Sequence, residues 1–156
     1  MPFCVMDSPV GRLRIDEAEG CVTGLNRVNE PLCPPATALL CEAVRQLHAY
    51  FDGSLTAFDL PLQTHGTAFQ EPCWAALREI PYGATATYGE QARRIGNPKA
   101  SRAVGGANHH NPISIIIPCH RVVGASGALT GYGGGLDMKA WLLEHERAVL
   151  AKQQHG

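Results

Sequence analysis

The sequence predicts an α+β protein with two domains, a strand-rich domain at residues 1–63 and a mainly helical domain at residues 64–156. Short stretches up to residue 28 alternate apolar and polar side chains, which is typical of β-strands. Residues 36–51 then repeat apolar side chains at helical spacing. From residue 67 onward, helix-start signals recur between breaks rich in glycine and proline, and this pattern indicates several short helices.

Three stretches in the first domain show the strand pattern. Residues 3–6 and the apolar side chains at Leu13 and Ile15 flank the turn sequence DSPVG, and residues 22–28 form the third stretch. Turn residues between short alternating stretches are expected where strands pair as neighbours. A small β-sheet is therefore predicted.

One helix and one further strand complete the prediction for this domain. The prolines of NEPLCPP interrupt the strand pattern before the helix of residues 36–51, and Gly53 is expected to end that helix. Residues 58–66, with the sequence FDLPLQTHG, are expected to form a last strand and a linker. The helix is expected to pack on the sheet.

Two capping-box sequences open helices in the second domain. Thr67 to Gln70 precedes an apolar face that continues to Ile80, and Pro72 removes one backbone donor near the start of that helix. Thr87 to Glu90 opens a shorter helix, which is expected to end at Gly96. Both helices are short and closely spaced along the chain.

A third helix is predicted directly afterwards, with Asn97 as its cap and Pro98 at its first position. Two short helices joined at Gly96 have the outline of a helix-turn-helix, and the second one carries Lys99 and Arg102 among small residues. Small residues allow close approach to another surface, so DNA binding is one interpretation. A helical hairpin that only packs against the core is the other.

The last part of the chain combines a glycine-rich segment with a helix. Residues 124–137 surround Tyr132 with glycines, which permit close approach to a ligand or free movement. Asp137 is expected to cap a final helix, with one side formed by Met138, Trp141, Leu142 and His145.

The composition limits the class of protein. The chain has 156 residues, of which 45% are hydrophobic and 17% charged, and this balance favours a folded chain. No apolar run reaches about 18 residues, and the N-terminus lacks the pattern of a secretory signal, so we expect a cytoplasmic protein without a membrane span. The six cysteines include no CxxC pair, so we expect reduced thiols and no metal site.

Charge is unevenly distributed between the two predicted domains. Residues 1–63 carry 4 basic and 8 acidic side chains, whereas residues 64–156 carry 9 basic and 6 acidic ones. The net charges are therefore −4 and +3. A polyanion would prefer the second domain.

The segment ISIIIPCHRVVG places a thiol beside an imidazole at the end of an apolar run. A thiolate supported by a histidine, with a carboxylate behind it, is a nucleophile, and Cys119, His120 and Glu146 supply these groups. A water molecule would carry the proton from Cys119 to His120. A hydrolase of the cysteine type and an inert buried thiol are the competing interpretations. If the thiol is catalytic, as a nucleophile of either kind, Asn111 is expected to be an amide that orients the reacting groups.

Several motifs in fixed order resemble the O6-alkylguanine-DNA alkyltransferases, single-use proteins that remove alkyl groups from guanine in DNA. The motifs are IPCHRVVG, GNPKASRAVGGA, NP at 111–112, GYGGGL and LLEHE. The resemblance covers roughly residues 7–146 and is dense from Gly66 onward. It implies an N-terminal ribonuclease H-like α/β domain, followed by a mainly helical, winged-helix-like domain with a helix-turn-helix.

The resemblance implies a role for each residue of the catalytic group. Cys119 is similar to the family's alkyl acceptor, His120 to its water-bridged base and Glu146 to the carboxylate that orients the base. Asn111 resembles the asparagine that braces the active-site turn. Tyr88 resembles the hydroxyl that faces N3 of the extruded guanine.

Other matched positions imply contacts with DNA and with the guanine. Arg102 resembles the finger that fills the gap in the base stack, and Asn97 and Ser101 match positions near the phosphates. The backbone of Cys119 and Val122 is implied to line the guanine site.

The remaining matched residues flank the substrate pocket. Tyr132 and Lys139 fit the loop and the helix beside it. Gly133 stands where many relatives carry a serine that bonds the guanine oxygen, so this contact is expected from a backbone N–H. His110 replaces a small residue and is expected to narrow one wall.

The resemblance also implies a reaction and a partner. The expected activity is irreversible, single-turnover transfer of the alkyl group from O6-alkylguanine, and from O4-alkylthymine, to Cys119 after base flipping. The expected partner is double-stranded DNA containing O6-alkylguanine, bound by a monomer that acts cooperatively on DNA, with no cofactor. A non-catalytic lesion sensor and a thiol hydrolase are the competing functions. Relatives of the sensor kind lack the acceptor cysteine.

Overall fold

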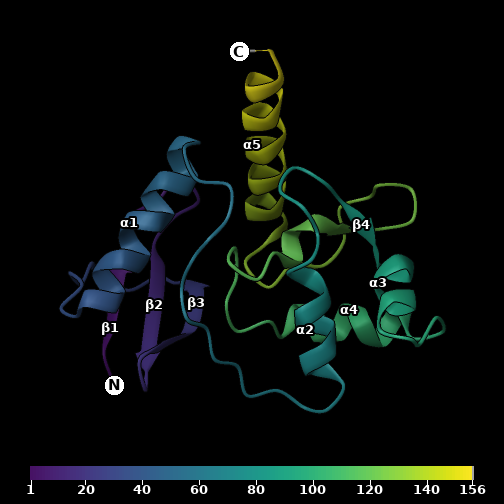
Figure 1. Cartoon of the computed structure of the whole chain (residues 1–156), viewed down its shortest axis with the longest axis horizontal. Coiled ribbons are helices and arrows are strands. Elements are labelled where there is room, and N and C mark those ends of the chain that lie inside the picture. Colours follow the sequence, from purple (N-terminus) through teal and green to yellow (C-terminus); the bar gives the residue numbers. More distant parts are fainter. Residues whose placement is uncertain (156) are drawn as a thin grey trace. The chain divides into compact units, whose positions relative to one another are not determined.

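The structure of the protein is a computed structural model that describes residues 1–155 (Figure 1). The chain forms two compact units, one at Met1–Thr64 and one beginning at His65. Within the described residues, no helix is both long enough and apolar enough to cross a membrane.

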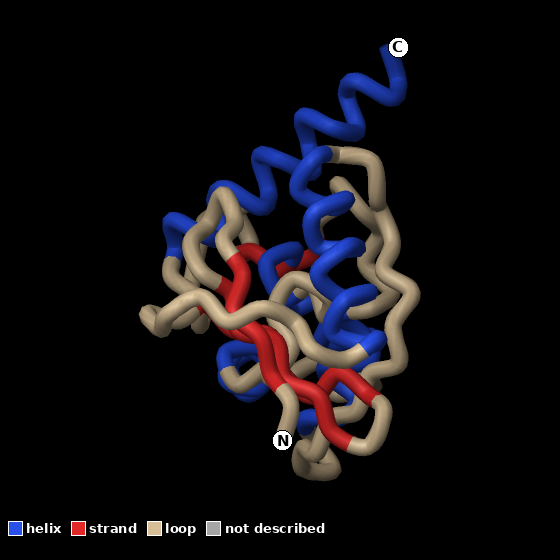
Figure 2. Tube along the Cα trace, turned by 90° about the vertical axis from the view of Figure 1, so that its left-hand side faces the viewer, coloured by secondary structure: helices blue, strands red, loops and turns tan. Residues whose placement is uncertain are grey.

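The first unit contains a three-stranded antiparallel sheet and one helix (Figures 1 and 2). The strands are β1 (Phe3–Met6), β2 (Leu13–Ala18) and β3 (Cys21–Arg27), in the order β1-β2-β3. Helix α1 (Ala38–Asp52) contacts all three strands. The buried apolar side chains shared by sheet and helix include Leu13, Ile15, Val22, Leu25, Leu40, Leu47 and Tyr50.

The ends of α1 follow from local chemistry. The hydroxyl of Thr37 accepts the N–H of Leu40 at 3.1 Å, which caps the first turn. Gly53 ends the helix in the left-handed conformation with φ 88°, as its position in the sequence predicted.

The strand predicted within residues 58–66 is wrong. Only Leu62 bridges to Val22, through bonds from Val22 N to Pro61 O at 2.8 Å and from Gln63 N to Val22 O at 3.0 Å. Pro61 has no N–H to donate, so the ladder does not extend on that side.

The second unit is mainly helical. Helices α2, α3 and α4 contact one another, and a short parallel pair of strands joins distant parts of the unit. Its elements are α2 (Gln70–Leu77), β4 (Ala86–Thr87), α3 (Tyr88–Arg94), α4 (Ser101–His109), the 3₁₀ helix η1 (Cys119–Arg121), β5 (Val122–Val123) and α5 (Leu136–His155).

The two predicted capping boxes are present. Thr67 N donates to Gln70 Oε1 at 3.0 Å, and Gln70 N donates to Thr67 Oγ1 at 3.1 Å. The same reciprocal pair of bonds joins Thr87 and Glu90 at the start of α3. The sequence had predicted that helix α2 continues to Ile80. In the structure, helix α2 ends at Leu77.

Asn97 does not cap α4, which begins at Ser101. The N–H of Asn97 instead donates to Ala92 O at 2.9 Å, while Gly96, with φ 81°, donates to Arg93 O at 3.0 Å. These two bonds form a Schellman motif, so Asn97 belongs to the end of α3. The chain then turns over residues 97–100 before α4 starts.

The start of the final helix also differs from the prediction. Helix α5 begins at Leu136, and Asp137 lies in its first turn and is not its cap. A carboxylate in the first turn is still favourable because it faces the positive end of the helix dipole.

A buried pair of amides connects α3 with α4. Gln91 and Asn108 exchange two hydrogen bonds of 2.9 and 2.8 Å, and Gln91 Nε2 also donates to Cys73 O of α2 at 3.1 Å. Trp74 Nε1 donates to Ala107 O at 2.8 Å. A fully bonded buried network of this kind fixes the mutual orientation of the three helices.

Candidate active site

The apolar run before Cys119 folds into tight turns. Ile116 N donates to Ser114 O at 2.8 Å around Ile115, whose φ is 71°. A buried β-branched residue rarely adopts this conformation, so the turn is strained and must be held by its surroundings. Cys119 N donates to Ile117 O at 2.8 Å, and η1 begins at Cys119.

Asn111 joins both sides of this turn. Its Nδ2 donates to Ile117 O at 2.8 Å and lies 3.2 Å from Cys119 Sγ, while its Oδ1 accepts the N–H of Ile113 at 3.0 Å. The buried amide therefore ties the position of the sulfur to the backbone of the apolar run. Asn111 thus supplies a side-chain donor to the sulfur.

Cys119 is 6% exposed, and its surroundings favour the protonated thiol. Burial raises the pKa of Cys119, and the hydrogen bond from Asn111 and the charge of Lys139 only partly oppose this. A base is consequently needed to turn this thiol into a nucleophile.

His120 is buried and bonded to a carboxylate. His120 Nε2 lies 2.7 Å from Glu146 Oε2. Burial lowers the pKa of His120 despite the neighbouring carboxylate, so the imidazole is neutral at physiological pH. Because Nε2 donates to Glu146, Nδ1 carries the free lone pair, and among the described residues it has no hydrogen-bonding partner.

Arg121 and Gly83 complete the surroundings of Glu146. Arg121 Nε and Nη2 donate to the two carboxylate oxygens at 2.8 and 3.1 Å, and Gly83 N donates to Oε1 at 3.2 Å. Burial alone would raise the pKa of Glu146, but the bonds from His120 and Arg121 outweigh it and hold the pKa far below its usual range. Glu146 is therefore ionised.

Sequence reasoning did not include Arg121 or Gly83 in the site. A signal existed for Arg121, because a guanidinium in an otherwise apolar segment needs a polar partner. Arg121 Nη1 also donates to Ile80 O at 2.7 Å, so the guanidinium connects η1 with the turn that follows α2. Gly83 acts through its backbone and carries no such signal.

Tyr88 and Lys139 meet at the glycine-rich segment. The Tyr88 hydroxyl donates to Thr130 O at 3.1 Å and accepts from Thr130 Oγ1 at 3.2 Å. Lys139 Nζ donates to the same carbonyl at 2.7 Å and lies 5.9 Å from the centre of the Tyr88 ring. Thr130, which sequence reasoning missed, thus links the two predicted site residues.

A groove of about 490 Å³ adjoins this contact. It brings together three of the predicted DNA-binding or catalytic residues, and its lining consists of Tyr88, Ser101, Arg102, Gly105, His109, Thr130 and Gly131. His109 lines this groove, whereas the described lining does not include His110, for which the sequence predicted a position in the pocket wall.

The other predicted residues occupy separate places. Asn97 lies in the turn after α3, and Val122 is buried in β5, where it pairs with Ala86. Tyr132 is buried beside the exposed Gly133. A Cβ atom added to Gly133 would lie 3.2 Å from the carbonyl oxygen of His109, so a serine there would press on that backbone.

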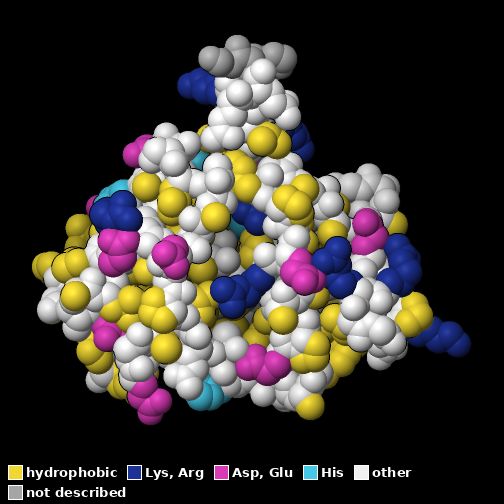
Figure 3. Space-filling view, viewed as in Figure 1, with side chains coloured by type: hydrophobic (Ala, Val, Ile, Leu, Met, Phe, Trp, Pro, Cys, Tyr) yellow, Lys and Arg dark blue, Asp and Glu magenta, His cyan; other side chains and the backbone are white. Residues whose placement is uncertain are grey.

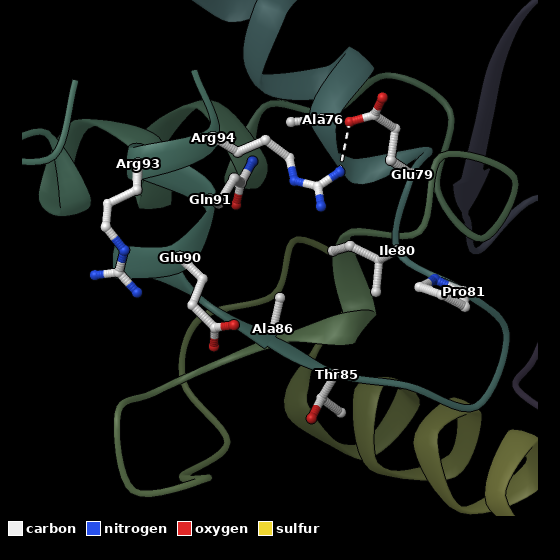
Figure 4. A pocket seen from close by; sticks show the side chains of 10 residues that line it. All are labelled: Ala76, Glu79, Ile80, Pro81, Thr85, Ala86, Glu90, Gln91, Arg93 and Arg94. Atoms are coloured by element: carbon white, nitrogen blue, oxygen red, sulfur yellow. Dashed lines mark hydrogen bonds and ion pairs between the residues drawn. The ribbon is translucent and has the colours of Figure 1, made fainter. Parts of the chain in front are cut away.

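A second cavity of about 500 Å³ lies between α2, the segment before β4, and α3 (Figure 4). Arg94 and Glu79 form an ion pair of 2.7 Å beside it. None of the described residues that line this cavity is a predicted site residue.

Acidic and basic side chains are interspersed on the face shown in Figure 3. Among the described residues, no group of three or more His, Cys, Asp and Glu side chains is arranged to hold a metal ion. The candidate site itself combines a buried thiol, a neutral histidine and an ionised carboxylate.

Comparison with known proteins supports a nucleic-acid role. Residues 68–148 match the family described as 6-O-methylguanine DNA methyltransferase, DNA binding domain. A methylated-DNA–protein-cysteine methyltransferase of Mycolicibacterium paratuberculosis is 51% identical over 151 residues, which cover 93% of this chain and 92% of that protein. One of Methanosarcina acetivorans is 65% identical over 105 residues, or 67% of each chain.

Solved structures give the same match. The crystal structure of Mycobacterium tuberculosis O6-methylguanine methyltransferase has a TM-score of 0.86 and 48% identity, and the match covers 94% of this chain and 93% of the other. The structure of Mycobacterium tuberculosis OGT in complex with DNA has a TM-score of 0.87 and 49% identity, with the same coverage. The mixed α/β fold of this chain is thus similar to theirs.

Proposed function

Because this chain belongs to the 6-O-methylguanine DNA methyltransferase family, we propose that it makes a single, irreversible transfer of an alkyl group from guanine O6 in DNA to Cys119. Its relatives of about 50% identity are methylated-DNA–protein-cysteine methyltransferases, so the chain is an enzyme of DNA repair that acts by alkyl transfer. One observation carries the proposed mechanism. His120, which follows Cys119 directly in the sequence, makes a buried hydrogen bond to Glu146.

Activation of Cys119 begins with the neutral imidazole. A water molecule between the thiol and His120 Nδ1 passes the proton of Cys119 to that nitrogen. The imidazolium that forms is stabilised by Glu146, whose charge Arg121 keeps in place. The sulfur, held against Asn111 Nδ2, then carries the negative charge.

The transfer step is a displacement at the alkyl carbon. The sulfur forms a bond to that carbon while the bond from the carbon to O6 breaks, and the electron pair goes to the guanine ring. The guanine anion takes up one proton from solvent, and the imidazolium of His120 releases its proton to solvent. The Tyr88 hydroxyl donates a hydrogen bond to guanine N3, where charge develops. To do so, it gives up its present bond to Thr130 O. The same chemistry applies to O4-alkylthymine.

Access to the alkyl group requires a flipped nucleotide, because O6 is stacked and paired in the duplex. Helix α4 approaches the duplex through its small residues, and Arg102 fills the gap left in the base stack. Ser101 and Asn97 contact phosphates near the lesion. A backbone N–H at Gly133 replaces the serine contact with the guanine oxygen, while Val122, Tyr132 and Lys139 enclose the base.

The finer architecture belongs to the same proposal. Residues 1–63 form a ribonuclease H-like domain, and residues 64–156 form a winged-helix-like domain with a helix-turn-helix. The Schellman motif between α3 and α4 and the buried Gln91–Asn108 pair support the helix-turn-helix. The protein is a monomer, and its molecules bind double-stranded DNA cooperatively.

Intact mass measurement after incubation with DNA containing O6-methylguanine tests this function. One methyl group per protein molecule is expected, located on the peptide that contains Cys119. Cys119→Ser is expected to bind the same DNA without transfer, because an alcohol is far less ionised than a thiol. Binding without transfer by the unmodified protein would indicate a lesion sensor, and repeated turnover of a peptide substrate would indicate a hydrolase.

A further inference from the structure

We infer that His109 is a further DNA-binding residue of the α4 groove and that its imidazole makes phosphate binding depend on pH. This inference rests on the proposed function, because it assumes that the groove receives DNA. His109 is exposed on the last turn of α4 and lines the groove together with Arg102.

The helix places both side chains on one face. Arg102, Gly105 and His109 follow one another at intervals of three and four residues, which is the spacing of side chains on the same side of an α-helix. His109 lies about 10 Å along the axis from Arg102. Gly105, between them, has no side chain to separate a ligand from the helix.

Most of the remaining lining offers no charge to a phosphate. Gly105 and Gly131 contribute backbone only, and Ser101 is neutral. The Tyr88 hydroxyl is already bonded to Thr130 in both directions. Within the described lining, only Arg102 and His109 can therefore carry a positive charge, and only His109 can change its charge between pH 5 and 8.

The charged or titratable groups near this part of the groove are Arg102, Lys139 and His110. Arg102 on the same helix is positive, and so is Lys139 of α5, which reaches the groove through Thr130 O and the Tyr88 ring. A bound phosphate attracts a protonated imidazole. Binding of DNA should consequently be coupled to uptake of a proton.

His110 provides a matched control. The two rings lie edge to face with centres 5.5 Å apart, and both side chains are exposed. His110 Nδ1 bonds to Gly106 O at 2.9 Å, and His110 lies outside the described groove lining. A general effect of surface histidines would involve both residues, whereas the proposed contact involves His109.

The experiment measures binding of a fluorescent, unmodified duplex by anisotropy, so that no alkyl transfer occurs. The unmodified protein should bind about threefold more tightly at about pH 6 than at about pH 8, and its salt dependence should steepen by about 0.9 in log–log slope, as for one added phosphate contact. His110→Gln should behave in the same way. His109→Gln should lose both effects, and His109→Arg should bind as tightly at the higher pH as the unmodified protein does at the lower.

Two results would overturn the inference. One is an unchanged pH effect in His109→Gln with an unchanged melting temperature, and the other is loss of the effect in His110→Gln. Failure of all four proteins to bind duplex DNA at either pH would instead contradict the proposed function, and the inference with it.

Discussion

His120 and Glu146 are joined by a 2.7 Å hydrogen bond inside the protein, with the histidine side chain 0% and the glutamate side chain 1% exposed. This bond determines the tautomer of the imidazole and leaves Nδ1 free to accept a proton. The same pair also links the stability of the protein to pH.

Stability should fall as the pH drops below about 6.5, the ordinary pKa of histidine. Burial lowers the pKa of His120 in the folded protein, so the unfolded chain binds this proton first, and acid favours unfolding. Glu146, whose folded pKa is also lowered, adds a further loss only below its ordinary value of 4.5. Denaturant unfolding at several pH values between about 7.5 and 5 measures the first loss.

His120→Asn is the comparison for this measurement. Its stability should change much less over the same pH range, because the buried imidazole is gone while the exposed histidines remain in both proteins. An equal loss in the variant would show that other groups cause the acid sensitivity.

Removing Arg121 should be strongly destabilising. Arg121→Met leaves the buried carboxylate of Glu146 without its guanidinium, and breaking a buried pair in this way typically costs about 3–5 kcal/mol. Arg94→Met is the matched control, because the Arg94–Glu79 pair is more than half exposed and should contribute within about 1 kcal/mol. Equal losses in the two variants would refute the special role of Arg121.

Arg102→Ala should slow repair of duplex DNA at least about tenfold more than reaction with free O6-benzylguanine, because only the duplex requires a flipped base. Single-turnover rates on both substrates measure the difference. Arg93→Ala, which removes an exposed arginine outside the α4 groove, should leave the ratio of the two rates unchanged. Equal slowing on both substrates by Arg102→Ala would show that Arg102 acts on the chemical step or on folding and not on base flipping.

The alkylated protein should melt earlier than the fresh protein. The added carbon must fit beside Asn111 Nδ2, which lies 3.2 Å from the sulfur, in a turn that already contains the strained Ile115. Overpacking of a buried site typically costs about 1–3 kcal/mol. Differential scanning calorimetry of protein before and after one equivalent of substrate measures the shift, with Cys119→Ser given the same substrate as the control.

The product should also stop accumulating at about one alkyl group per molecule, because a thioether is a poor leaving group and the nucleophile is consumed. Tryptic mapping should find the label on Cys119. Repeated turnover, or label mainly on Cys73 or Cys41, would contradict the assignment.

Local signals determined much of the fold. The capping boxes at Thr67 and Thr87, the glycine stop at Gly53 and the alternation in the first strands predicted elements that the structure contains. These signals act over a few residues, so the sequence displays them directly. The strand predicted within residues 58–66 is not formed, because Pro61 has no N–H to donate to the neighbouring β3. The sequence alone does not show which strand would lie beside Pro61.

The motifs of the sequence also indicated the family and, through it, the residues Cys119, His120 and Glu146 as a group. The structure brings His120 and Glu146 into contact across 26 positions of the chain. It alone showed that Arg121 and Gly83 share the carboxylate, that Thr130 holds Tyr88, and that His109 lies in the groove. These contacts depend on backbone atoms and on side chains from separate elements, whose meeting is decided by the packing of the helices and turns, which no local pattern in the sequence records.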